Sequence, residues 1–545
     1  MTAGSFSAQN MSLADAIYLG GNILTGEGLG SGAPRRASAL AVQAGVIAAT
    51  GTDADILAQW RGPKTDVVDL HGAFVMPGFN DAHVHLASAG LEKLRIDLVG
   101  CKSLTEMQQR IAAAAAKAAP GAWLEGRGWD HMLWTTKQLP TRLDLDKVTA
   151  GHPAVFTRVD GHIAIANSAA LVAAGVGRAT PDPAGGKFDR RPSGELTGIV
   201  RENAVDAIYS HAPPPSASQR RRALDLATKD AVRNGITSVQ DYSTWNDFLV
   251  FEQMEREGAL PLRVSEWLSF DDPLNVLLKQ RSGHPLDDPM LHTGMLKGFM
   301  DGSLGSRTAA LLAPYADEPG NSGIPLYEQE KLDQMTVERA KAGFQIGFHA
   351  IGDRGAQMAL DAFAAAETAG YGKNLRFRIE HAQVVSPGDF ERFHELSVIA
   401  SMQPSHLLTD MHWAEARLGP ERTKTSYAWK SFLDHGVPLA FGTDYPVEPV
   451  TPFRGLYAAL TRKDETGDMS YHPEESLTIE EALYAYTEGA AYAEFAETKK
   501  GKLVPGEFAD FVVLDRDITT IPAAGVLGTK VLRTVVGGHT VWQVP

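Results

Sequence analysis

The chain has 545 residues, 44% of them hydrophobic and 21% charged, and carries a formal net charge of −15. Its length exceeds what one small core requires, so we expect one large domain with a smaller companion. The negative charge argues against nucleic acid or an anionic membrane surface as a partner. Cys101 is the only cysteine, which excludes an internal disulfide and a cysteine-based metal site.

Residues 1–13 are predicted to form an N-terminal tail. The first fifteen residues lack the basic start and apolar run of a secretory signal. No stretch reaches the ~18 apolar residues of a membrane span. These patterns predict a cytoplasmic protein without a membrane partner.

β-rich runs separated by glycine-containing turns occur near both ends of the chain. Because chain termini often lie close together, we predict one small β-sandwich domain built from residues 14–75 and 496–545. The runs are Ala16–Leu19, Ala39–Val42, Val46–Ala49, Val67–Leu70, Asp510–Leu514, Val531–Val535 and Thr540–Trp542.

Residues 76–495 alternate between strand and helix patterns, which predicts an α/β fold with a (β/α)8 TIM-like barrel. The helical segments are Ser103–Ala118, Gln219–Asn234, Arg354–Ala369, Pro387–Leu396 and Thr478–Phe495. Seven strands follow the one that ends near His85: Ile236–Gln240, Leu262–Ser265, Met295–Phe299, Gln345–His349, Phe377–His381, Val398–Met402 and Pro438–Phe441.

One segment interrupts this alternation. The chain between His85 and Asp241 is far longer than the roughly 30 residues of a βαβ unit. Residues from about 120 to 215 are rich in Gly, Pro and Trp. We therefore predict an inserted lobe after the first barrel strand, which would cover the mouth of the active site.

The first barrel strand ends in a His-x-His pattern. His83 and His85 are two positions apart, so on a strand they project to the same side and form half of a metal site. The alternative is a pair of loop histidines without a ligand. Other metal-ligand side chains follow at or near later strand ends, where barrel enzymes carry their functional residues: Lys297, His349, His381 and Asp444. This set favours a metal site.

The ligand candidates lie in characteristic sequence motifs. These are Pro77–His85, Lys297–Thr308, His349–Asp353, Ile379–Gln383, Phe441–Pro446 and the C-terminal Gly506–Leu514. The set resembles the amidohydrolase superfamily, and within it the YtcJ-like or amidohydrolase-3 group, which includes N-substituted formamide deformylase. The resemblance extends from about residue 14 to the end and implies the barrel fold and metal dependence. It specifies the substrate only weakly.

The resemblance implies a role for each candidate ligand. His83 and His85 would bind a more buried metal, and His349 and His381 a more exposed one. Lys297 would bridge the two as a carboxylated lysine, since an ammonium has no acceptor atom, and Asp444 would complete the site. The expected cofactor is Zn²⁺, with one or two ions per chain. The alternative for Lys297 is an ordinary ion pair with Asp301.

The resemblance also implies hydrolysis of a C–N bond in a small amide or N-substituted formamide. Metal-bound hydroxide would attack the carbonyl carbon, and Asp444 would transfer the water proton to the leaving nitrogen. Two alternatives stay open: a cyclic amide, carbamate or ester hydrolase with the same site, and a non-catalytic binding or regulatory protein on this barrel. A homodimer is expected only by analogy with relatives.

Substrate contacts are predicted at Trp129, His162, Glu195, Arg307 and Tyr445. Asp160-Gly-His162 and Gly194–Gly198 resemble family elements that face the substrate, and His162 could donate to the substrate carbonyl or stabilise the lobe. For Arg307 the alternative is an ion pair with Asp301 or Asp353, and for Trp129 it is core packing. Asp81 is predicted to orient a ligating histidine.

Overall fold

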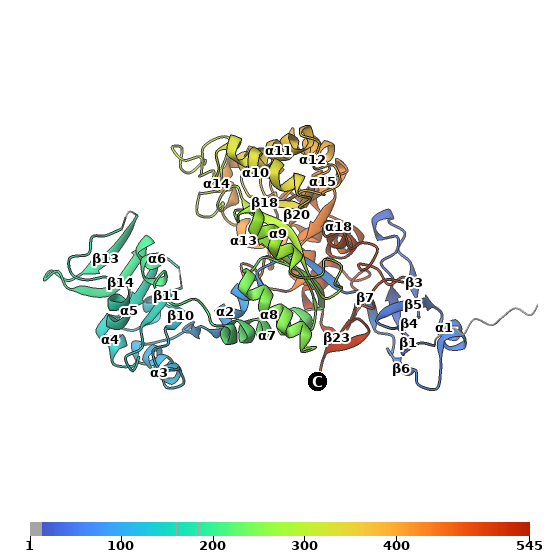
Figure 1. The fold of residues 1–545 in the computed structure, drawn as a ribbon, viewed down its shortest axis with the longest axis horizontal. Helices are drawn as coiled ribbons and strands as arrows, with labels where there is room; N and C mark the ends of the chain where they lie inside the picture. Colours follow the sequence, from blue (N-terminus) through green and yellow to red (C-terminus); the bar gives the residue numbers. More distant parts are fainter. Residues whose placement is uncertain (1–12, 160, 184) are drawn as a thin grey trace, which may run out of the picture. The chain divides into compact units, whose positions relative to one another are not determined.

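The computed structural model describes residues 13–159, 161–183 and 185–545, which form two compact units (Figure 1). One unit combines the chain up to Ala87 with Ala227–Pro545, and the other is Ser88–Leu226. The predicted N-terminal tail lies outside the described residues except for Leu13, and Asp160 also lies outside them.

The first unit contains a closed barrel of eight parallel strands, which confirms the predicted fold. Hydrogen bonds from Asp444 N to His83 O (2.8 Å) and from His85 N to Tyr445 O (2.8 Å) join the last strand to the first. In order around the barrel the strands are β8 (Phe79–Val84), β15 (Ile236–Asp241), β16 (Arg263–Ser269), β17 (Leu291–Phe299), β18 (Ile346–Ala350), β19 (Arg378–His381), β20 (Ile399–Met402) and β21 (Leu439–Phe441).

Helices connect these strands, and side chains cap several of them. At Thr244, which precedes α8, the Asp247 carboxylate accepts from the Thr244 backbone N at 2.9 Å, as a capping box requires. The helices are α8 (Trp245–Arg256), α9 (Leu274–Ser282), α10 (Gln329–Lys341), α11 (Asp353–Thr368), α12 (Asp389–Glu395), α13 (Ser405–Asp410), α14 (Ala414–Arg422), α15 (Trp429–Asp434), α16 (Pro452–Thr461), α17 (Ile479–Tyr486) and α18 (Glu488–Ala493).

The single helix predicted over Thr478–Phe495 is in fact two helices. Thr487 separates α17 from α18 with φ −128° and ψ −92°, outside the helical region. Directly after it, a Cβ on Gly489 would stand 2.4 Å from the Leu439 carbonyl oxygen, so only glycine allows this approach to β21. The helical pattern could not reveal this close packing.

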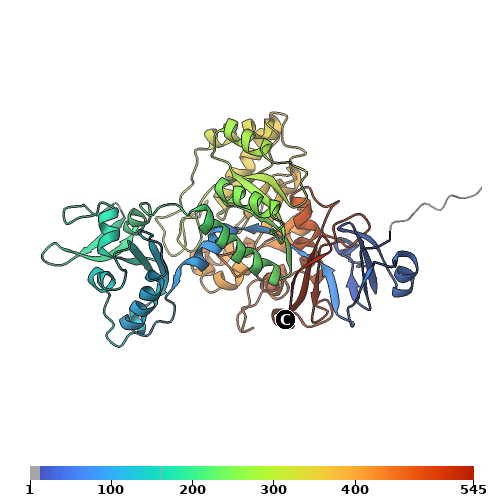
Figure 2. The same ribbon diagram turned by 60° about the horizontal axis from the view of Figure 1, so that its bottom comes forward.

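The two ends of the chain form β-sheets next to the barrel, as predicted (Figures 1 and 2). Strand β22 pairs antiparallel with β7, with Val512 opposite Met76. The six-stranded sheet contains β24 (His539–Gln543), β23 (Val531–Val536), β22 (Phe511–Leu514), β7 (Phe74–Pro77), β2 (Asn22–Leu24) and β3 (Arg36–Ala37). The four-stranded sheet contains β5 (Val46–Gly51), β4 (Ala39–Gln43), β1 (Ala16–Leu19) and β6 (Asp66–Asp69), with α1 (Asp53–Trp60) beside it.

The second unit, Ser88–Leu226, includes more of the sequence than the lobe predicted near residues 120–215. The chain enters it through α2 (Leu86–Leu94) and leaves it through α7 (Ala217–Arg233). Its sheet contains β13 (Gly186–Arg190), β14 (Leu196–Glu202), β12 (Ile163–Ala166), β11 (Ala154–Arg158), β10 (Leu124–Trp129) and β9 (Ile96–Asp97), and its helices include α3 (Leu104–Ala115), α4 (Arg142–Asp146), α5 (Ser168–Ala173) and α6 (Asn203–Tyr209). Across both units, no helix of the described residues is long and apolar enough to span a bilayer.

Candidate metal centre

Strand β8 brings the two histidines of the His-x-His pattern to the end of the barrel. The Nδ1 of buried His83 lies 2.9 Å from Glu380 Oε2, and the Nδ1 of His85 lies 3.0 Å from the Tyr242 carbonyl oxygen. Because these acceptors hold both Nδ1–H groups, the lone pair of each ring is on Nε2. The two Nε2 atoms face Asp444 Oδ1, at 3.7 Å from His83 and 3.1 Å from His85.

Asp81 fixes the two backbone segments that carry these candidate ligands. One oxygen of Asp81 accepts from the backbone N of His83 (3.2 Å) and of Thr443 (2.8 Å), and the other accepts from the Thr443 hydroxyl (2.6 Å). Asp81 therefore positions His83 and the neighbouring Asp444 through the main chain. Asp81 was predicted to orient a ligating histidine, and its contact is with the backbone of His83, whereas Glu380 contacts the imidazole.

Asp444 also faces a second pair of histidines. Its Oδ2 lies 3.1 Å from His406 Nε2, and one ligand atom each from His381, His406 and Asp444 lies within 4.8 Å of the others. His381 Nδ1 is buried and has no hydrogen-bond partner among the described residues. A buried nitrogen without a partner is costly unless a ligand satisfies it.

The sequence analysis missed His406. It lies in α13, shortly after Met402 at the end of the seventh barrel strand. That proximity to a strand end is the one signal that could have identified it.

Lys297 and His349 complete the group of predicted ligands. Lys297 Nζ lies 3.2 Å from His83 Nε2, and no carboxylate of the described residues forms an ion pair with it. The alternative pairing with Asp301 does not occur, because that carboxylate accepts backbone N–H groups of Ala310, Ile351 and Gly352. His349 Nε2 lies 3.1 Å from the Gly302 carbonyl oxygen, and its ring centroid is 4.5 Å from that of His381.

Burial shifts the pKa values of these nitrogen groups downward and so favours their neutral forms. It lowers the pKa of His83 to about 4 and that of His349 to about 3, and it holds the pKa of His381 well below its ordinary value. The pKa of Lys297 falls to about 8 for the same reason. Neutral imidazoles next to a carboxylate are the donor set that binds Zn²⁺ and related ions. The residues present therefore fit a divalent metal.

Comparison with known proteins identifies the family. A family model described as the amidohydrolase family matches residues 66–542. This chain belongs to the amidohydrolase family. A solved structure of an uncharacterized metal-dependent hydrolase from Pyrococcus furiosus is 32% identical, with a TM-score of 0.79, and the match covers 93% of this chain and 100% of that chain. This amidohydrolase therefore has the fold of a metal-dependent hydrolase.

Three relatives match this amidohydrolase over most of their length. Protein LONG AFTER FAR-RED 3 of Arabidopsis thaliana is 35% identical over 97% of this chain and 92% of its own. Putative amidohydrolase YtcJ of Bacillus subtilis is 33% identical over 97% and 99%, and N-substituted formamide deformylase of Arthrobacter pascens is 27% identical over 92% and 94%. The predicted membership in the YtcJ-like group is confirmed.

Three predicted substrate residues belong to the second unit and have partners within it. Trp129 is fully buried in the core of that unit and donates to the Phe156 carbonyl at 2.8 Å, which agrees with the alternative of core packing and not with substrate contact. His162 Nδ1 lies 2.9 Å from Glu202, and half-exposed Glu195 pairs with Arg142 at 2.6 Å.

The other two predicted substrate residues belong to the first unit. Arg307 pairs with Asp317 at 2.9 Å, whereas the sequence analysis had considered Asp301 or Asp353 as its partner. Tyr445 follows Asp444 in the sequence and is largely buried, and its hydroxyl lies 3.3 Å from the Asp230 carboxylate.

Proposed function

We propose that this amidohydrolase uses zinc to cleave the C–N bond of a small non-peptide amide, most specifically an N-substituted formamide. One observation carries the proposal: His83, His85 and His381 surround one carboxylate, Asp444, at the C-terminal ends of the barrel strands. The name of the Arthrobacter pascens relative supports the choice of a formamide.

His83, His85 and Asp444 would hold one ion, and His349 and His381 a second. Bound zinc supplies a Lewis acid and lowers the pKa of a coordinated water toward ~7. Lys297 would become a ligand by carboxylation, which requires a neutral amine. Burial without a carboxylate partner lowers its pKa to about 8, so the neutral amine is a larger fraction than in an ordinary lysine.

Asp444 is the proposed general base and acid of the reaction. Burial raises its pKa, but nearby His83 and the side-chain contacts with His406 and His85 outweigh burial and hold the pKa well below the ordinary value. The side chain is therefore a carboxylate at neutral pH. While His406 holds Oδ2 at 3.1 Å, Oδ1 can accept the proton of the attacking water and pass it to the leaving nitrogen.

The test compares wild type with Asp444→Asn on a panel of formamides, linear and cyclic amides, carbamates and esters. We expect metal-dependent turnover, fastest on N-substituted formamides, and a loss of about 10²–10⁴-fold in kcat in the variant with its metal retained. Near-normal rates in the variant would remove Asp444 from this role. Bound metal without turnover on any substrate would favour the binding-protein alternative.

A further inference from the structure

A second group of metal-ligating side chains lies beside the start of β17. It consists of Glu252 and Glu255 on α8 and of His284 and Asp288 in the segment between α9 and β17, and we call it the α8 cluster. The candidate metal centre lies at the C-terminal ends of the barrel strands. Because all eight strands are parallel, the α8 cluster is at the opposite end of the barrel.

His284 is oriented as metal-binding histidines usually are. Its Nδ1 lies 3.2 Å from Glu252 Oε1, so Nδ1 donates to that carboxylate and Nε2 carries the lone pair. Only 10% of the side chain is exposed, and Nε2 has no hydrogen-bond partner among the described residues. Nε2 faces Asp288 Oδ2 at 3.6 Å and Glu255 Oε2 at 3.7 Å.

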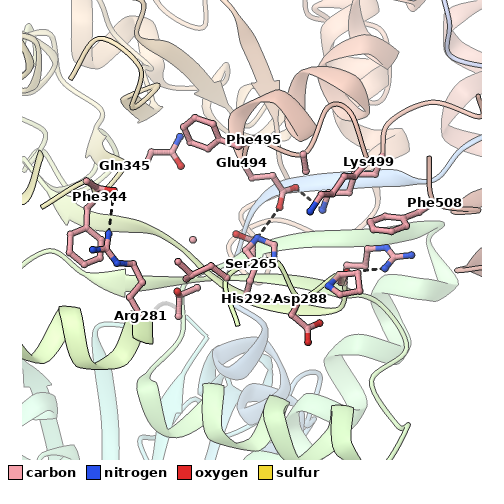
Figure 3. Close-up of a pocket in the computed structure, with 18 residues that line it drawn as sticks. Ser265, Arg281, Asp288, His292, Phe344, Gln345, Glu494, Phe495, Lys499 and Phe508 are labelled. Carbon is pink, nitrogen blue, oxygen red and sulfur yellow. Dashed lines mark hydrogen bonds and ion pairs between the residues drawn. The ribbon is translucent and has the colours of Figure 1, made fainter. Parts of the chain in front are cut away.

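The backbone fixes the Asp288 carboxylate in this orientation. Its Oδ1 accepts from Met290 N at 2.8 Å and from Leu291 N at 3.2 Å, which leaves Oδ2 for the cluster. Asp288 also borders a cavity of about 290 Å³ at the same end of the barrel (Figure 3). In that view its carboxylate points away from Glu494 and Lys499 on the far wall.

The buried cations of the neighbouring cavity are paired with carboxylates, Lys500 with Glu494 at 2.8 Å and Arg263 with Asp510 at 2.6 Å. The α8 cluster differs because negative charge predominates in it. Apart from His284, the one basic side chain that pairs with it in the described structure is exposed Arg256, 3.6 Å from Glu252.

The two carboxylate oxygens that face Nε2 repel its lone pair and each other, and a divalent cation bound between the three atoms would neutralise that repulsion. The three donor atoms lie within 4.8 Å of one another. In a tetrahedral zinc site with bonds of ~2.1 Å, ligand atoms are about 3.4 Å apart. The distances from His284 Nε2 to the two carboxylate oxygens, 3.6 and 3.7 Å, are close to this value.

We propose that Glu255, His284 and Asp288 bind a divalent cation of the zinc class at a site separate from the catalytic centre, with Glu252 orienting His284. One nitrogen and two carboxylate oxygens suit Zn²⁺ and neighbouring first-row metals. The cation ties the end of α8 to the start of β17. Its role is structural, since strand ends at this face of a barrel contribute to stability.

Metal counting on the full chain tests this site. Wild type, Glu255→Gln, His284→Gln and the control Asp287→Asn are equilibrated with low micromolar Zn²⁺, freed of unbound metal and analysed by mass spectrometry. Asp287 is exposed in the same loop, so its variant removes an equal charge without removing a ligand. We expect Glu255→Gln and His284→Gln to contain one zinc equivalent fewer per chain than wild type and Asp287→Asn.

Two further measurements make the result decisive. Added Zn²⁺ should raise the Tm of wild type and Asp287→Asn by more than that of the two ligand variants, and zinc-edge diffraction should show a peak between the three donor atoms. Equal zinc contents in all four proteins, or an imidazolium resonance for His284 in zinc-loaded wild type, would overturn the proposal. Glu255→Gln alone decides the matter if His284→Gln does not fold.

The inference is independent of the proposed activity. The α8 cluster lies away from the catalytic ligands, so hydrolysis per catalytic metal should be equal in the four proteins. Loss of the extra zinc with unchanged turnover supports the second site, whereas failure of the substrate panel leaves the zinc counts unaffected.

Discussion

Replacement of Glu380 by glutamine tests whether a buried carboxylate sets the metal affinity of the centre. Glu380 is fully buried, with Oε2 2.9 Å from His83 Nδ1 and Oε1 2.8 Å from Arg378 Nε. Glutamine keeps the shape and removes the charge. The variant therefore weakens the hydrogen bond that orients His83 and leaves the Arg378 guanidinium without its carboxylate.

The structure sets the expected size of both effects. A carboxylate that orients a ligating histidine is worth about 10–100-fold in metal affinity, or roughly 1.4–2.7 kcal/mol. Breaking a buried ion pair costs about 3–5 kcal/mol of stability. Arg378 keeps hydrogen bonds to Ala82 O (3.0 Å) and Ser401 Oγ (2.8 Å), which places the expected loss near the lower end of that range.

Chelator competition measures the metal affinity, and urea unfolding measures the stability. The matched control is Glu475→Gln, which removes another buried carboxylate, one that accepts a hydrogen bond from Ser431 N at 2.9 Å. The control should lose stability and retain metal affinity. Wild-type metal affinity in Glu380→Gln would refute the role assigned to Glu380.

Three more variants separate the contributions of neighbouring residues. In Gly442→Ala the new Cβ would stand 2.5 Å from His83 N, so we expect a lower metal content by mass spectrometry and a stability loss of about 1–3 kcal/mol. The control Gly388→Ala has open space around its Cβ and should bind metal normally. His406→Ala removes a hydrogen bond to Asp444 worth about 1.5–3 kcal/mol, so kcat should fall roughly 10–100-fold while the metal content stays unchanged. Loss of metal would show instead that His406 is a ligand. Asp510→Asn breaks a buried bidentate ion pair with Arg263, and urea unfolding should show a loss of about 3–5 kcal/mol in the free energy of unfolding. An unchanged metal content would confirm that the effect is confined to the junction of the barrel with the β-sheets.

The barrel and most candidate ligands could be predicted because each depends on a local pattern. Alternating strand and helix segments indicate the closed sheet, and strand ends indicate where functional residues lie. His83 and His85 fit this reasoning because simple alternation along a strand places both on one side. Whether Trp129 packs in a core or lines a pocket could not be predicted in this way, because core and pocket aromatic residues have the same local sequence pattern.

His381 and Asp444 show why the details of the centre required the structure. Strict alternation would place Glu380 and His381 on opposite faces of β19, yet Glu380 contacts the His83 ring and the His381 ring centroid lies 5.0 Å from it. The backbone departs from regular strand geometry here, because His381 has φ 72° and Asp444 has φ 59°.

Non-glycine residues adopt such positive φ angles at a cost of about 1–3 kcal/mol, and they do so where surrounding contacts impose them. For Asp444 those contacts are the hydrogen bonds of Asp81 to Thr443 and the pairing of the last strand with the first. The turn that orients Asp444 thus depends on closure of the whole barrel, which no short stretch of sequence encodes.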